Sequence, residues 1–320
     1  MGLAAINTPL VVSAAGTAGF AGLSTLEAAI QQGALSFFTV KVANALLYAL
    51  NLYAVQQPGR LDGRRAAQVS NNKNNKKQHE LFSDNRERSL VFPSGWAFAI
   101  WAVIFLGELC FCTSAMLVPA SAPVATAIQK ASAGFMMGQV FQVLWAASFR
   151  PKYSEGRLRY LSAFMLSGIA WSLSRAHAGF TSVAQSTVNL GQYILYFLPM
   201  SLHFGWTLAA ALVNWNGSLA APEKVSPALL AGAGHLSAVV ATALGVSVTI
   251  LRRAPVVGGV VAWALAACTT GMQQRLEKAV GVKDPQQAGI YGARVQKWLC
   301  GIGAAISLGT SLVVAFWKSV

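Results

Sequence analysis

Long apolar stretches alternate with short polar connections along most of the chain. A helix that crosses the hydrocarbon core of a bilayer needs about 20 mostly apolar residues, and eight stretches approach or exceed that length. The pattern therefore predicts an all-α, polytopic membrane helix bundle of about eight transmembrane helices. The expected helices cover Leu35–Val55, Gly95–Val118, Thr126–Phe149, Arg159–Phe180, Val188–Val213, Ser226–Leu251, Pro255–Met272 and Gln296–Trp317.

The first 34 residues do not fit this pattern. They are rich in small residues, and their apolar run from Pro9 to Leu23 is too short for a span. We expect residues 1–34 to form a surface or re-entrant lead-in. They contain no Lys or Arg, which argues against a conventional signal peptide or an Arg-rich transit peptide.

One long polar loop interrupts the bundle between residues 56 and 94, and its centre is rich in Asn and Lys. Such a segment is typical of a flexible loop or of one that a partner orders. A shorter polar connection follows Met272. Neither is large enough for an independent catalytic domain.

Composition agrees with a membrane protein, because 55% of the residues are hydrophobic and only 11% are charged. The chain has 24 Lys and Arg against 10 Asp and Glu, and the charges lie mainly in the loops. Basic loops stay on the cytoplasmic-type side of a membrane. Of the 24 basic residues, 18 lie in or beside the loops of one side and 5 on the other. This distribution predicts that both termini lie on the translocated side.

The basic loop has no recognition helix, so we expect it to contact anionic lipid or an acidic partner and not nucleic acid.

Few ionisable groups lie within the predicted helices, and such groups are costly in a bilayer. Glu108 and Lys41 are the two deepest in their helices, and we expect them to form an intramembrane pair. Among the histidines, His203 is the best candidate for an axial ligand of a pigment metal, but the sequence favours a hydrogen-bonded packing role for it. The sequence predicts no other metal site.

The four cysteines lie in or beside apolar stretches, which favours a role as small packing residues over a role in disulfides.

Aromatic residues within the helices suggest a pocket. Most of the nine tryptophans fit an aromatic belt at the lipid headgroups, but Trp101 and Trp206 lie a turn or more inside their helices. Pro199 also lies inside a predicted span, where it can kink the helix and open space. Trp101, Phe105, Trp145 and Trp206 would offer flat surfaces to a tetrapyrrole or a sterol.

Three motifs resemble the tryptophan-rich sensory protein family, which includes the mitochondrial translocator protein (peripheral benzodiazepine receptor). They are the sequences FPSGWAFAIW at 92–101, GQVFQVLW at 138–145, and PMSLHFGW at 199–206 followed by Asn214. They occur in the order and at the spacing of the longer plant- and bacterial-type members. The resemblance implies a five-helix core over 35–216 that includes the polar loop 56–94, and a three-helix extension over 217–320.

The resemblance also implies a ligand site between the first five helices. Its candidate residues are Trp101, Phe105, Trp145, Pro199, His203, Trp206 and Asn214. The predicted function is non-enzymatic binding or movement of a small hydrophobic molecule of the tetrapyrrole (chlorophyll or haem), sterol or lipid class. No catalytic motif is present.

A second hypothesis stays open, in which the chain is an accessory structural subunit of a large photosynthetic or respiratory complex. The polar loop would then dock onto other subunits, and pigments or lipids would fill the aromatic crevices. Both hypotheses predict an integral membrane protein, and a thylakoid or mitochondrial membrane is compatible with either.

Overall fold

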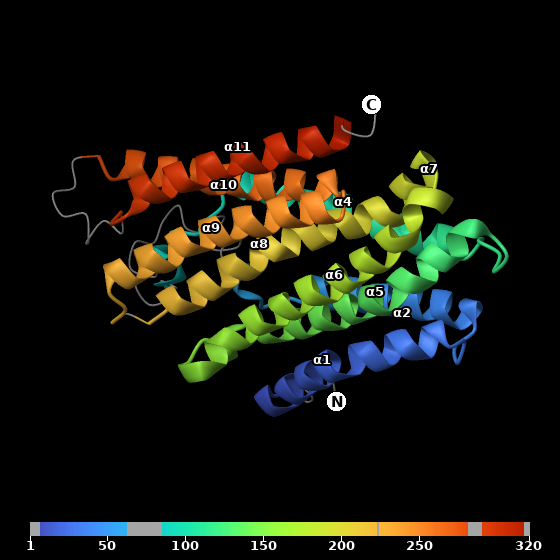
Figure 1. Cartoon of the computed structure of the whole chain (residues 1–320). Helices are drawn as coiled ribbons and strands as arrows, with labels where there is room; N and C mark the ends of the chain where they lie inside the picture. The colour runs from blue at the N-terminus through green and yellow to red at the C-terminus, as the bar shows by residue number, and fades with distance from the viewer. Residues whose placement is uncertain (1–6, 63–84, 223, 281–289, 317–320) are drawn as a thin grey trace.

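The computed structural model describes residues 7–62, 85–222, 224–280 and 290–316 (Figure 1). Every regular element in these ranges is helical, which confirms the predicted all-α polytopic bundle. The long helices are α1 (Pro9–Gln31), α2 (Phe37–Gln56), α4 (Ile100–Ala115), α5 (Pro123–Ser148), α6 (Leu161–Thr187), α8 (Leu198–Ala220), α9 (Pro227–Leu251), α10 (Pro255–Lys278) and α11 (Ala293–Phe316). Short turns are η2 (Asn85–Arg88), η3 (Gly95–Ala99), η4 (Pro151–Tyr153), η5 (Gly156–Tyr160), α7 (Leu190–Gln192) and the π-helix η6 (Tyr193–Phe197).

Seven segments of the described chain are long and apolar enough to cross a membrane. They are α1, α2, η3 with α4, α7 to α8, α9, α10 and α11. Helices α5 and α6 are also long but less apolar, although the sequence pattern predicted both as spans. Helix α5 packs against α1, α2 and α6, and most of its positions are buried within the protein. Because protein covers α5, its polar side chains need protein partners and do not have to match lipid.

Helix α1 corrects the prediction for the N-terminal segment. Residues 9–31 form a 23-residue helix, which begins at the N-cap Thr8 and carries Pro9 in its first turn. Its small residues permit close packing: a Cβ atom on Gly16 would collide with Met165, and one on Gly19 would lie 3.0 Å from the ring of Phe141. The small-residue composition that made this run look unlike a span is therefore what lets α1 lie against α5 and α6.

Successive helices run back and forth, so their connections gather at the two ends of the bundle (Figure 1). One end holds the start of α1 together with the turns between α5 and α6 and between α8 and α9. At this end Asn7 donates a hydrogen bond to the Ala147 carbonyl at 3.1 Å, and the Tyr153 hydroxyl donates to Asn7 Oδ1 at 2.5 Å. Burial raises the pKa of the Tyr153 phenol, which keeps it a donor. The start of α1 thus lies on the side of the basic loops, opposite to the side on which the prediction placed the N-terminal segment.

The segment from η2 to η3 joins the two parts of the bundle. Ser94 donates its backbone N–H to the Ala267 carbonyl of α10 at 2.9 Å. Arg275 donates to the Ser89 carbonyl at 3.0 Å, and Arg88 donates to the Pro222 carbonyl at 3.1 Å. These bonds hold the chain before α4 against α10 and the end of α8. Residues 63–84, which include most of the predicted docking loop, lie outside the described residues.

Candidate functional site

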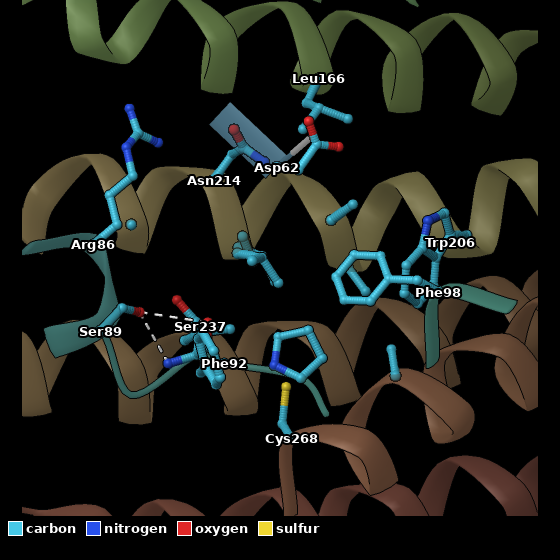
Figure 2. A pocket seen from close by; sticks show the side chains of 18 of the residues that line it. Asp62, Arg86, Ser89, Phe92, Phe98, Leu166, Trp206, Asn214, Ser237 and Cys268 are labelled. Atoms are coloured by element: carbon cyan, nitrogen blue, oxygen red, sulfur yellow. Dashed lines mark hydrogen bonds between the residues drawn. The ribbon is translucent and has the colours of Figure 1, made fainter. Parts of the chain in front are cut away.

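A cavity of about 790 Å³ lies between the central helices. It is lined by α2, α4, α5 and α6 on one side, by α9, α10 and α11 on the other, and by α8 and the segment 86–98 (Figure 2). The sequence analysis placed the pocket between the first five predicted helices. The structure extends that wall to the three C-terminal helices, which supply Ser237, Ala238, Ala241, Ala264, Leu265, Cys268, Gln296 and Cys300.

Aromatic rings form the inner part of the cavity. Trp206 lies edge-on to Phe98, with ring centroids 5.6 Å apart, and edge-on to Trp101 at 6.2 Å. Trp101 in turn stacks on Phe105, with centroids 5.2 Å apart and an interplanar angle of 16°. Figure 2 shows Phe98 and Trp206 together at one side of the cavity. This arrangement offers flat apolar surface from both α4 and α8.

Polar and charged residues gather toward the side of the basic loops. Figure 2 shows Asp62, Arg86, Ser89, Asn214 and Ser237 away from the aromatic pair. Arg60 makes a two-point ion pair with Asp62, at 3.0 and 2.9 Å. Two guanidinium groups also lie over aromatic rings of the cavity wall: Arg60 over Trp145 at 5.3 Å and Arg86 over Phe149 at 5.4 Å. The cavity is therefore amphipathic, with its charged groups toward the end of the bundle that holds the basic loops.

Several buried polar atoms of the cavity wall have no hydrogen-bond partner within the described chain. Gln142 lacks a partner at both amide atoms, and its side chain is only 1% exposed. The indole N–H groups of Trp145 and Trp206 and the Oε1 atom of Gln296 are also without a partner. A buried polar group left unsatisfied costs about 1–3 kcal/mol, so native proteins rarely keep several together. These atoms are suited to hydrogen-bond a molecule inside the cavity.

The structure brings five of the seven predicted ligand residues to the cavity wall, namely Trp101, Phe105, Trp145, Trp206 and Asn214. Pro199 and His203 are not among its lining residues. Pro199 lies in the first turn of α8, directly after the π-helix, and its ring packs where a Cβ of Gly107 would be, 2.7 Å away. It fixes the approach of α8 to α4.

His203 belongs to a buried polar cluster behind the aromatic wall. Its Nδ1 lies 2.7 Å from Oε1 of Glu108, and both side chains are fully buried. Glu108 Oε2 accepts a hydrogen bond from Gln139 at 3.1 Å, and Gln139 Oε1 accepts one from Asn51 at 2.6 Å. The cluster joins α2, α4, α5 and α8. The His203 ring meets Trp101 edge-on at 5.5 Å, so the cluster supports a residue that lines the cavity.

The expected pair of Lys41 and Glu108 is wrong. The Lys41 ammonium donates to the carbonyls of Met116 and Val118, at 3.1 and 2.9 Å, just beyond the end of α4. A helix end carries carbonyls without helical partners and a partial negative charge, which a cation stabilises. Lys41 therefore satisfies a helix end, and Glu108 takes His203 as its partner.

The sequence pattern did not indicate the wall contributed by α9 to α11, which includes Gln296, Cys268 and Cys300. Gln296 lies at the start of the last predicted helix, and nothing in its local pattern distinguishes it from an interfacial residue. Phe98 was part of a quoted motif but was not selected. Phe98 lies three residues before Trp101 and seven before Phe105, so all three share one face of the helix. This spacing could have identified Phe98 as a pocket residue.

Comparison with known proteins identifies the family. No curated protein and no solved structure matches the chain. The model of the TSPO-like protein family matches residues 65–282, which is more than half of the chain and includes the helices from α4 to α10. With its seven candidate spans, the chain is an integral membrane protein and belongs to the TSPO-like family.

Proposed function

We propose that this protein binds a small, flat, hydrophobic molecule in the cavity between α8 and its neighbours, without catalysing a reaction. The observation that carries the proposal is the cavity of about 790 Å³, which is within the range of small-molecule sites, about 300–1,000 Å³. Membership of the TSPO-like family supports the same function.

The cavity wall favours a ligand that combines an apolar ring system with hydrogen-bonding groups. Trp206, Phe98 and Trp101 contact the ring system, whereas Gln142 and the indole N–H of Trp145 bind polar substituents. Among the three predicted ligand classes, a tetrapyrrole with carboxylate or lactam groups meets both requirements. A sterol, with a single hydroxyl group, leaves more of these atoms unsatisfied.

The proposed absence of catalysis rests on the groups that line the cavity. In the described part of the chain the lining carboxylate is Asp62, and it is paired with Arg60. No described histidine lines the cavity, because His203 lies behind the aromatic wall. The polar groups are thus arranged to hold a ligand and not to transfer protons to it.

Titration with protoporphyrin IX in detergent tests the proposal. A bound porphyrin absorbs where tryptophan emits, so binding quenches the fluorescence of Trp101, Trp145 and Trp206. Trp206→Ala removes a ring that contacts the ligand and should weaken binding by about tenfold or more, since aromatic contacts contribute about 1–3 kcal/mol.

Trp298→Ala is the matched control, because Trp298 lies on α11, is 66% exposed and does not line the cavity. Circular dichroism verifies that each variant is folded. Equal affinity of the two variants, or no saturable binding of porphyrin, cholesterol or a fatty acid by the unmodified protein, contradicts the proposed function.

A further inference from the structure

Two cysteine side chains meet on the cavity wall where α10 packs against α11. The two thiol groups are within hydrogen-bonding reach of each other. Gln296 Nε2 donates a hydrogen bond to the Cys300 sulfur at 3.4 Å. Both cysteines are free thiols and are at most 5% exposed. The Cys300 sulfur thus lies beside a second thiol and accepts a hydrogen bond from a buried amide.

Helices α10 and α11 pack against each other at this level. A Cβ atom on Gly301, the residue after Cys300, would lie 3.8 Å from Cγ2 of Thr269, the residue after Cys268. One turn deeper, a Cβ on Gly303 would lie 3.2 Å from Cδ1 of Leu265. Neighbouring thiols on helices that pack in this way need only small movements to reach the short Cβ separation of a disulfide.

The cavity gives small reagents a route to this pair, because Cys268 and Cys300 both line it. Figure 2 shows the Cys268 sulfur pointing into the cavity. The other two cysteines lie away from the cavity. Cys110 is exposed on α4, and Cys112 is buried with its thiol toward the Asn44 carbonyl at 3.8 Å; neither lines the cavity.

We propose that Cys268 and Cys300 form an oxidisable dithiol that a hydroperoxide converts to a disulfide. The Cys300 sulfur attacks one peroxide oxygen, the O–O bond breaks, and a sulfenic acid forms while the other oxygen leaves as water or an alcohol. The Cys268 sulfur then attacks the sulfenic sulfur, the S–S bond forms, and water leaves. Two thiols lose two electrons and two protons in total, and the peroxide is reduced by two electrons.

The disulfide would join α10 to α11 covalently at the cavity wall. It would also remove both thiol protons and change the acceptor of the Gln296 amide. This site is independent of the identity of the cavity's ligand, so the inference can be tested without one.

The experiment uses the purified full-length protein in detergent. Hydrogen peroxide is added to the reduced protein, free thiols are alkylated with N-ethylmaleimide under denaturing conditions, and the products are mapped by mass spectrometry. We expect the number of alkylated cysteines to fall from four to two, with the Cys268 and Cys300 peptides joined. Cys268→Ser should stop the reaction at a sulfenic acid on Cys300, which dimedone traps.

A second measurement uses phenylarsine oxide, which condenses with two neighbouring thiols and releases one water without oxidation. It should protect Cys268 and Cys300 from alkylation in the reduced protein, and either single Ser variant should lose this protection. The double variant Cys110→Ser/Cys112→Ser is the matched control and should still form the disulfide. Four alkylated cysteines after peroxide, a link that involves Cys110 or Cys112, or no protection by phenylarsine oxide would each overturn the proposal.

Discussion

Two glutamines of α5, Gln139 in the buried Glu108 cluster and Gln142 on the cavity wall, are in opposite situations. In the cluster, Glu108 binds His203 and Gln139 through both carboxylate oxygens. In the cavity, Gln142 has no partner at either amide atom within the described chain. Gln139 and Gln142 lie three residues apart on α5, so the same helix supplies a satisfied amide and an unsatisfied one. Partners, and not burial, distinguish a group that stabilises the bundle from a group that is available to a ligand.

The largest effect should follow removal of the carboxylate at the centre of the cluster. Glu108→Ala leaves His203 and Gln139 buried without their acceptor, and breaking a buried pair in this way costs about 3–5 kcal/mol. The free energy of unfolding in mixed micelles measures this loss. Glu27→Ala is the control, because its partner Arg175 is 49% exposed and such pairs contribute about 0–1 kcal/mol. Equal losses in the two variants would show that the cluster does not stabilise the fold.

Gln139→Leu and Gln142→Leu form a sharper pair. Gln139→Leu removes the donor to Glu108 and the acceptor of Asn51, and should lower the free energy of unfolding by about 1–3 kcal/mol. Gln142→Leu removes amide atoms that have no partner, so it should leave stability unchanged or raise it slightly. The same two proteins are then titrated with protoporphyrin IX. If Gln142→Leu proves the more destabilising of the two, the distinction between the two regions is incorrect.

The sequence predicted the helical bundle and much of the aromatic wall, because both depend on local pattern. A sufficiently long apolar stretch predicts a membrane-spanning helix. The depth of an indole such as Trp206 within its helix distinguishes a pocket residue from an interfacial one. Which side of a helix contacts which neighbour depends on packing between segments that are far apart in sequence. Gln139 and Gln142 lie on one face of α5, and no periodicity shows that only the first meets a carboxylate from α4.

The same limit explains the errors. Lys41 and Glu108 are both deep in their helices, but depth does not show that Lys41 reaches the end of α4 while Glu108 faces α8. The contribution of α9 to α11 to the cavity arises from helix packing beyond the residues that carried the motifs. The span over residues 9–31 was missed because the apolar run was taken to end at Leu23, whereas the helix continues to Gln31 and is apolar enough along its length to cross a membrane.

The smallest expected change in stability follows from enlarging an alanine side chain on the cavity wall, compared with the same change in the packed bundle. Ala241 lines the cavity, so Ala241→Leu places three additional carbon atoms where there is room for them. Filling a cavity commonly raises the free energy of unfolding by about 0.5–2 kcal/mol. Ala133 on α5 is 1% exposed and packs in a cluster with Val40 and Met136, so the same substitution there meets side chains and should cost about 1–3 kcal/mol.

The free energy of unfolding in mixed micelles compares the two variants. Porphyrin titration should also show weaker binding for Ala241→Leu, since the added side chain occupies ligand space. A loss of stability in Ala241→Leu as large as that in Ala133→Leu would mean that the cavity wall has no room for a larger side chain, and it would count against a ligand site at this position.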